Sequence, residues 1–392
     1  MDVDALRQAL RERAATAEPP GSSAAEVLGA LVRPRLVGSE GWTATRHALS
    51  ERFSALGYTE RLHHFSISPL PGRFCLPVLG MAVLLSSVLA SPALEAGNRG
   101  VALAALTCGG LIAWAVAAGT ARATDNWNFR RMDLANLWFQ APAARPRWLI
   151  VAHFDSKSQF VPLALRAVAI AAALGAWAGL LILVVLGGPI SQSPVLLDGL
   201  GAIAIVAGVA LLLSGAGNGS PGALDNGSGL ATLLGIADRE RAAADIAFLA
   251  TDAEELGLAG ARAIAQELPP LDGVINIDGI DDAGPFHLLE RFGLRHAGYA
   301  PHLAMALLLA SRAMGVTAHR RDVPPGVLVD HMAFVRAGFP ALTLMRGKLS
   351  SMARVHRPGD DLRHLRGAGV EEAVELVCAA LHVLRRGEDA GQ

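Results

Sequence analysis

The sequence predicts an α/β protein, a three-layer sandwich with a mixed, mostly parallel central sheet, into which four transmembrane helices are inserted as two hairpins. Two observations predict this fold class. Strand-like apolar runs alternate with helical segments along the polar parts of the chain, which is typical of α/β sandwiches. The chain has more apolar residues than a soluble protein usually has, and they are concentrated in a few long tracts.

The composition excludes several classes of protein. Hydrophobic residues make up 52% of the 392 residues and charged residues only 18%, compared with ~25% in typical soluble domains. Such a chain is too apolar to be intrinsically disordered. The net charge of −1 provides no basic field, so nucleic acid is not an expected partner. The three cysteines, Cys75, Cys108 and Cys378, are too few and too scattered for a disulfide framework or a thiolate zinc site.

Four apolar tracts are each long enough to cross the ~30 Å hydrocarbon layer of a bilayer as a helix. They cover residues 74–94, 101–121, 167–186 and 195–213. Short breaks separate the members of each pair, so we expect one transmembrane hairpin at 74–121 and a second at 167–218. The alternative, buried helices of a large soluble protein, is disfavoured because such apolar runs are usually only ~10–14 residues long.

The charges that flank the hairpins predict their orientation. The two distal turns hold only Arg99, whereas basic residues gather on the side of the polar segments: Arg73, Arg122, Arg130, Arg131, Lys157 and Arg166. The positive-inside rule then predicts a multi-pass membrane protein whose polar part is cytoplasmic. The acidic, amphipathic first residues do not resemble a secretory signal, which agrees with this orientation. Because each hairpin leaves and returns on one side, segments 1–73, 122–166 and 219–392 can form one discontinuous domain.

Within that domain, helical and strand-like patterns alternate. Apolar residues recur with helical spacing over 4–16 and 43–56, and a strand-like alternation follows over 60–68. After the first hairpin come two strand-like runs at 134–140 and 146–156, the second apolar enough for the centre of a sheet. After the second hairpin we expect helices at 229–242, 260–267, 301–314 and 370–386, interleaved with strands at 244–252, 273–280 and 339–345.

Histidine and carboxylate side chains cluster where these buried strands end. They are His153 and Asp155 in an H-x-D, Asp225, the pair Glu254 and Glu255, Asp278, and His356. The carboxyl ends of strands are where open α/β sheets bind ligands. Imidazole nitrogens and carboxylate oxygens without thiolates suit a zinc ion. Each residue alone would more often be a structural hydrogen-bonding group, but their recurrence at strand ends predicts a metal site.

The motifs around these residues resemble those of the zinc aminopeptidases of peptidase family M28. In chain order they are A-H-F-D-S, G-A-L-D-N-G-S-G, T-D-A-E-E-L-G-L-A-G, N-I-D, V-D-H-M-A-F-V-R-A-G-F-P-A-L and H-R-P-G-D. The resemblance extends over nearly all of the polar chain, and it implies the three-layer sandwich of that family.

The resemblance also implies a ligand set for two zinc ions per chain. His153 and Asp278 would bind one ion, Glu255 and His356 would bind the other, and Asp225 would bridge both. Two ions ~3.5–4 Å apart can polarise a scissile carbonyl and lower the pKa of a bridging water. The resemblance further implies a cis peptide bond after Asp225.

Three more residues receive roles from their place beside the ligands. Glu254 matches the family's general base, which would take the proton of the attacking water and deliver it to the leaving amine. Asp155 lies two residues beyond His153 on an extended strand, so its side chain points to the same side. It can therefore orient the imidazole without itself binding the metal. Asp360 is expected to act in the same way on His356. For Asp252 and His331 we expect structural roles.

Two features depart from the family pattern. The residue before the last histidine ligand is often a tyrosine that assists the oxyanion, and here it is Val355. The H-x-D and the bridging aspartate are normally separated by about a dozen residues, whereas here a predicted hairpin lies between His153 and Asp225. Because the tethers on both sides of this hairpin are short, we expect the site to lie near the membrane surface. The alternative is that the hairpins only anchor the enzyme.

The leading functional hypothesis is a membrane-embedded exopeptidase that removes N-terminal residues from peptides or from membrane proteins, with the lipid bilayer as its second partner. A related zinc acyltransferase of the glutaminyl cyclase kind resembles the same fold but works with one metal, so the number of bound zinc ions separates the two. A third hypothesis is a catalytically silent membrane scaffold, which the retention of every expected ligand and of Glu254 disfavours.

Overall fold

The computed structural model describes residues 3–16, 21–241, 243–293, 299–324 and 326–389. The chain divides into two compact units, each described here by itself. The first unit comprises Met1–Ser66, Asp133–Lys157 and Asn218–Gln392, and we call it the sheet unit. The second comprises Ile67–Met132 and Ser158–Gly217, and we call it the helical unit.

The sheet has eight strands in the order β1-β2-β4-β3-β5-β8-β6-β7. Their bounds are β1 Thr59–Ile67, β2 Met132–Gln140, β3 Trp148–His153, β4 Ile246–Thr251, β5 Gly273–Ile280, β6 Phe286–Arg291, β7 Ala318–Asp322 and β8 Ala341–Arg346. The central strands β4, β3, β5 and β8 run parallel, whereas β2 and β6 join them as antiparallel neighbours. The mixed, mostly parallel sheet that the sequence predicts is therefore confirmed.

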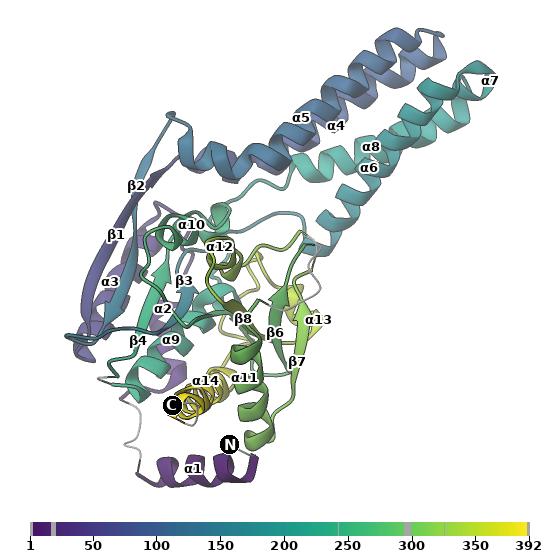
Figure 1. Ribbon diagram of the computed structural model, residues 1–392. Helices are drawn as coiled ribbons and strands as arrows, with labels where there is room; N and C mark the ends of the chain where they lie inside the picture. Colours follow the sequence, from purple (N-terminus) through teal and green to yellow (C-terminus); the bar gives the residue numbers. More distant parts are fainter. Residues whose placement is uncertain (1–2, 17–20, 242, 294–298, 325, 390–392) are drawn as a thin grey trace. The chain divides into compact units, whose positions relative to one another are not determined.

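Helices cover both faces of this sheet, which makes the unit a three-layer sandwich (Figure 1). One layer contains α1 Val3–Thr16, α2 Ala24–Leu31, α3 Glu40–Ala55, α9 Ser228–Arg239, α11 Pro301–Met314 and α14 Ala368–Asp389. The other contains α10 Ala259–Ala265 and α12 His331–Arg336. Successive residues of β3 point to opposite faces of the sheet. Ile150 packs with the first layer of helices, and Leu149 packs with the layer of α10 and α12.

Several elements of this unit were not predicted. Strand β7 has the sequence AHRRD and is largely exposed at the sheet edge, so it has none of the apolar alternation that marks a buried strand. Helix α2 did carry a signal, since Ser23 and Glu26 form a capping box at its start. Helices α12 and α13 Leu349–Met352 are too short for a periodic pattern.

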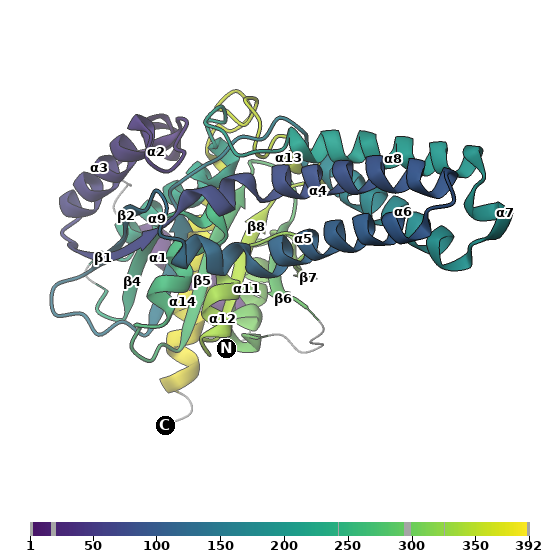
Figure 2. The same cartoon turned by 90° about the horizontal axis from the view of Figure 1, so that it is seen from above.

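The helical unit contains the four apolar tracts as long helices that form two antiparallel hairpins (Figures 1 and 2). Helices α4 Pro69–Glu95 and α5 Arg99–Asn126 form the first; α6 Leu163–Leu186, the short α7 Gly188–Ser191 and α8 Pro194–Leu212 form the second. Helices α4, α5 and α6 extend beyond the predicted apolar tracts and include flanking charged residues such as Arg73 and Arg122. All four are long and apolar enough to cross a membrane, and their outward residues include exposed Leu, Val and Trp side chains.

Small residues allow α4 and α8 to pack closely. A Cβ added to Gly80 of α4 would lie 2.5 Å from the carbonyl oxygen of Gly208 and 2.5 Å from the amide nitrogen of Leu212, both in α8. Such backbone contact is typical of helix pairs in membranes. At the distal end, the Arg99 guanidinium donates hydrogen bonds to the carbonyl oxygens of Val184 and Val185, which satisfies the C-terminal end of α6.

We expect Gly80→Leu to separate α4 from α8 and to destabilise the helical unit by ~1–3 kcal/mol, the usual cost of overpacking. Thermal unfolding and limited proteolysis of the detergent-solubilised protein measure the effect. Gly119→Leu in α5 is the matched control, since a Cβ added there meets nothing within 4 Å. Equal melting temperatures for the two variants would contradict the close packing of α4 on α8.

Candidate active site

The register of the central strands places two site residues, His153 and Asp278, at the carboxyl end of the sheet. His153, the last residue of β3, pairs with Thr251, the last residue of β4. On the other side of β3, Val151 pairs with Asn276 of β5. His153 lies two residues after Val151, and Asp278 lies two residues after Asn276. Because the strands are parallel, their carboxyl ends meet at this end of the sheet.

Asp225 lies in the turn Ala223–Gly227 (η1), directly before α9. The side chain of Asn226 fixes this turn to β5: its Nδ2 donates to the carbonyl oxygen of Ile277, and its Oδ1 accepts from the amide of Gly279. The peptide bond between Asp225 and Asn226 is cis, as the resemblance implied. These contacts hold the Asp225 carboxylate near the end of β5.

Glu254 and Glu255 are held by a short 3-10 turn, Glu254–Leu256 (η2), that follows β4. The Asp155 carboxylate accepts both amides at its start, from Glu254 at 3.0 Å and from Glu255 at 3.2 Å. Ala253, which precedes the turn, has a left-handed backbone with φ +53°, an uncommon conformation for a residue other than glycine. Backbones of this kind concentrate at functional sites.

The five predicted ligands converge as two triads that share Asp225. At the first position, formed by His153, Asp225 and Asp278, His153 Nε2 lies 3.1 Å from Asp225 Oδ1 and 3.6 Å from Asp278 Oδ1. At the second position, formed by Asp225, Glu255 and His356, His356 Nε2 lies 3.1 Å from Asp225 Oδ2 and 3.2 Å from Glu255 Oε2. Asp225 thus presents one oxygen to each position.

Glu254 lies beside the first position without belonging to either triad. Its Oε2 is 4.0 Å from His153 Nε2, and its side chain is buried. Burial raises the pKa of Glu254 well above its usual range; His153 opposes this effect, and the carboxylates of Glu255, Asp330 and Asp278 add to it. A carboxyl group so placed can exchange a proton with a molecule bound at the triads.

The chemistry of the two triads fits a zinc ion. His153 Nε2 is buried and makes no well-formed hydrogen bond within the described residues, although carboxylate oxygens surround it. Burial lowers the pKa of His153, but Glu254, Asp155, Asp225 and Asp278 outweigh it and raise that pKa well above the usual value. The cluster therefore favours a positive charge at this point, and its nitrogen and oxygen donors are the ligands of catalytic zinc sites.

The carboxylates of Asp155 and Asp360 both accept hydrogen bonds from backbone amides of the site. His153 Nδ1 lies 3.1 Å from the backbone oxygen of Asp155, whereas the Asp155 carboxylate is 3.6 Å away and binds the η2 amides instead. The Asp360 carboxylate accepts the amides of Leu224 at 2.7 Å and Asp225 at 3.1 Å. The Asp360 carboxylate therefore binds the backbone of the η1 turn that carries Asp225. The expectation that it also orients His356 stays a prediction.

We expect Asp360→Ala to weaken zinc binding ~10–100-fold, the usual effect of losing a group that orients a ligand, because the Asp225 turn loses two acceptors. Competition with a chromophoric chelator measures the affinity. Asp361→Ala is the matched control, since Asp361 pairs with Arg363 at the surface. An Asp360→Ala protein with wild-type zinc affinity would exclude this positioning role.

Sequence reasoning missed two basic residues of the site. Arg35 is fully buried and donates to carbonyl oxygens that flank the site, including those of Phe154 and Gly222. Burial lowers the pKa of Arg35 to about 10, although nearby carboxylates, first that of Asp360, oppose the effect. The Lys157 ammonium lies 2.8 Å from Glu255 Oε2. The H-x-D-S-K sequence was a local signal for Lys157, whereas nothing near Arg35 marks it as buried.

The other residues singled out in the sequence have structural partners. Asp252 Oδ1 accepts the indole N–H of Trp42 at 2.8 Å, and the His331 ring bonds the hydroxyl of Thr343 at 2.7 Å. Burial lowers the pKa of His331 to about 3, so this ring is neutral. Val355 is buried. His296, whose sequence context is not typical of a metal ligand, lies outside the described residues.

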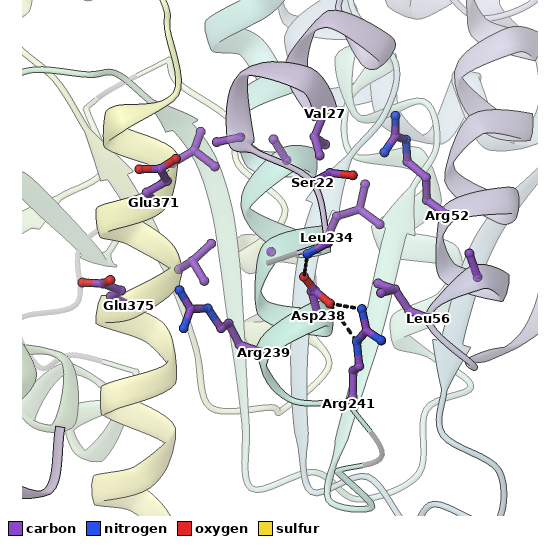
Figure 3. A pocket seen from close by; sticks show the side chains of 17 residues that line it. Ser22, Val27, Arg52, Leu56, Leu234, Asp238, Arg239, Arg241, Glu371 and Glu375 are labelled. Atoms are coloured by element: carbon purple, nitrogen blue, oxygen red, sulfur yellow. Dashed lines mark hydrogen bonds and ion pairs between the residues drawn. The ribbon is translucent and has the colours of Figure 1, made fainter. Parts of the chain in front are cut away.

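A cavity of about 420 Å³ in the sheet unit lies apart from this cluster (Figure 3). Its walls come from α2, α3, α9 and α14, and its labelled side chains mix arginines such as Arg52 and Arg239 with acidic residues such as Glu371. None of the five predicted ligands lines it. The cavity is therefore not the candidate active site.

A three-layer α/β sandwich with a buried His/Asp/Glu cluster at the carboxyl ends of its central strands is an arrangement of metal-dependent hydrolases. The chain belongs to peptidase family M28, whose model matches residues 135–381, more than half of its length. No curated protein matches the sequence.

Solved structures share the fold at low identity. BSAP, a zinc aminopeptidase from Bacillus subtilis, is 13% identical with a TM-score of 0.53, over 92% of this chain and 94% of that one. The aminopeptidase from Aneurinibacillus sp. strain AM-1 is 14% identical with a TM-score of 0.52, over 92% of each chain. Porphyromonas gingivalis glutaminyl cyclase is 14% identical with a TM-score of 0.55, over 93% of this chain and all of that one. The likeness shows the fold that these proteins have in common.

Proposed function

We propose that this M28 peptidase is a membrane-embedded aminopeptidase that uses two zinc ions to hydrolyse N-terminal peptide bonds. The observation that carries the proposal is the pair of triads that share Asp225, one oxygen facing each position. Two positions bridged by one carboxylate are what a co-catalytic pair of ions requires. His153 and Asp278 would complete the first position, and Glu255 and His356 the second.

Bound zinc would supply a Lewis acid for the scissile carbonyl and acidify the attacking water. The residues of the chain supply the rest. Glu254 takes a proton from the water and returns it to the leaving amine. Asp155 keeps the Glu254 backbone in place through its amide. His153 is held by its second nitrogen against the backbone oxygen of Asp155, which fixes the orientation of the ring.

An assay on defined peptides tests the proposal. Purified full-length protein in detergent should release the N-terminal amino acid from peptides with a free amine and should leave acetylated peptides intact. A chelator should abolish the release, and added Zn²⁺ should restore it. Internal cleavage of the acetylated peptides would instead indicate an endopeptidase.

A second candidate function is the glutaminyl cyclase reaction, because glutaminyl cyclases share this fold at the same low identity as the aminopeptidases do. The products distinguish the two. A cyclase converts an N-terminal glutamine to pyroglutamate and releases ammonia, leaving the peptide at full length. Mass spectrometry of a Gln-Leu-Phe peptide after incubation separates this product from free glutamine.

We further propose that the helical unit crosses the membrane four times and that the sheet unit is cytoplasmic. The lengths of the four helices and their exposed apolar faces support the insertion. The basic residues Arg73, Arg122 and Arg166 lie at the helix ends that lead to the sheet unit, which supports the orientation. A single cysteine at the exposed position Glu267 should react with an impermeant maleimide only after the cells are permeabilised.

Membrane-bound peptides or the N-termini of membrane proteins are the substrates we propose. Helix α6 begins at Leu163, 10 residues after His153, and α8 ends at Leu212, 13 residues before Asp225. The two connections between the site and the hairpin are therefore short, at most ~3.6 Å per residue. Replacing both hairpins by Gly/Ser linkers should lower activity on such substrates more than on soluble peptides. Full activity of the truncated enzyme on its membrane substrates would leave the hairpins with an anchoring role alone.

A further inference from the structure

Lys157 is one of only two lysines in the chain, the other being Lys348. It contacts Glu255 three times. Its ammonium lies 2.8 Å from Glu255 Oε2, the same group lies 3.3 Å from the Glu255 carbonyl oxygen, and its amide donates to Glu255 Oε1 at 3.2 Å. The side chain is 18% exposed, and that of Glu255 only 3%. Both the side-chain ammonium and the backbone amide of Lys157 therefore bind Glu255.

The preceding chain explains why Lys157 is fixed there. Beyond the end of β3 the amide of Phe154 donates to the oxygen of Thr251, and the amide of Ser156 donates to the oxygen of Arg35. These bonds hold residues 154–156 in place between β4 and the Arg35 segment. Lys157 thus emerges directly beside the turn η2, which carries Glu255.

The ammonium of Lys157 contacts a residue of the second metal position, Glu255. The oxygen that it contacts, Glu255 Oε2, is also the oxygen that faces His356 Nε2 at 3.2 Å. At the first position, the basic group that faces Asp278 among the described residues is His153, at 3.6 Å, and no lysine or arginine pairs with it there. A fixed ammonium repels a divalent cation that shares its carboxylate, and burial strengthens the repulsion.

We propose that Lys157 makes the two zinc positions unequal, so that the first position, at His153, Asp225 and Asp278, binds its ion tightly, and the second position, at Asp225, Glu255 and His356, holds an exchangeable ion. The inference rests on the proposed function. The ammonium competes with the second ion for the lone pairs of Glu255, and it supplies part of the positive charge that the second ion would otherwise contribute. A lysine suits this role because its charge is compact and can sit against a single oxygen.

Titration of metal-free, full-length protein in detergent with Zn²⁺, in the presence of a competing chelator, tests the inference by binding alone. The wild type should bind one ion tightly and a second at least tenfold more weakly. Lys157→Met should strengthen the second step at least tenfold and leave the first within about threefold. Lys157→Arg, which keeps the charge, should retain the gap, and Lys348→Met at the exposed second lysine is the matched control.

Two results would overturn the inference. One is a Lys157→Met protein, folded by circular dichroism, whose second step equals that of the wild type. The other is a protein in which Lys157→Met and Lys157→Gln both fail to fold while Lys157→Arg is stable, which would assign Lys157 a structural role. Failure of the proposed function is distinct from both, since it would appear as a wild type that binds no zinc or an Asp225→Asn protein that binds as the wild type does.

Discussion

Glu254→Gln is expected to lower kcat for N-terminal hydrolysis by ~10²–10⁴-fold, the usual contribution of a general base, while zinc content and fold are retained. Glutamine matches the shape of glutamate but cannot accept the proton of the attacking water. Glu254 belongs to neither triad, so its charge is not needed for ligand binding. Its backbone amide is fixed by the Asp155 carboxylate, and this hydrogen bond does not depend on the side chain of residue 254.

Steady-state kinetics on a chromogenic amino-acid amide, together with zinc analysis of the same preparation, measures this effect. Glu267→Gln is a matched control, since Glu267 lies at the surface and its carboxylate is 3.4 Å from His63, outside both triads. A loss of kcat that follows a loss of zinc would give Glu254 a role in metal binding instead. Unchanged hydrolysis by a zinc-loaded Glu254→Gln protein would exclude it as the base.

Elements with a strong and long apolar pattern were predictable from the sequence. Strands β3, β4 and β5 are buried along their whole length, and their apolar runs predicted both the strands and their central place in the sheet. The polar residues at the ends of these runs predicted which side chains would meet. Parallel strands bring their carboxyl ends to the same side of a sheet, so the convergence of these side chains could be predicted from the sequence.

The supporting contacts of the site could not be predicted, because their partners are far apart in sequence. Asp360 binds the amide of Leu224, 136 positions away, and the Lys157 ammonium meets the carboxylate of Glu255, 98 positions away. No local pattern connects such residues. The exposed edge strand β7 also escaped prediction, since a polar strand at a sheet edge resembles a loop in its composition.

Arg35 is the clearest of these cases, and its replacement is expected to have the largest effect on stability. The side chain is fully buried and cross-links three segments through carbonyl oxygens, those of Arg33 at 2.9 Å, Phe154 at 2.9 Å and Gly222 at 3.0 Å. A further bond reaches the oxygen of Pro221 at 2.6 Å. Its charge also lies close enough to the carboxylates of Asp360, Asp225, Asp155 and Glu255 to interact with all four.

We expect Arg35→Met to lower the free energy of unfolding of the sheet unit by ~3–5 kcal/mol, because removing one member of a buried charged group leaves the others uncompensated. Buried carbonyl oxygens on both sides of the site would lose their donor, which adds to the cost.

Denaturant unfolding of the solubilised protein, followed by tryptophan fluorescence, measures the loss. Arg33→Met is the matched control, because Arg33 is part-buried and its guanidinium donates a local hydrogen bond to the carbonyl oxygen of Ala30. Arg35→Lys should recover only part of the stability, since one ammonium cannot reach the acceptors of a planar guanidinium in all three segments. If Arg35→Met unfolds at the same denaturant concentration as Arg33→Met, the cross-link contributes nothing to the stability of the site.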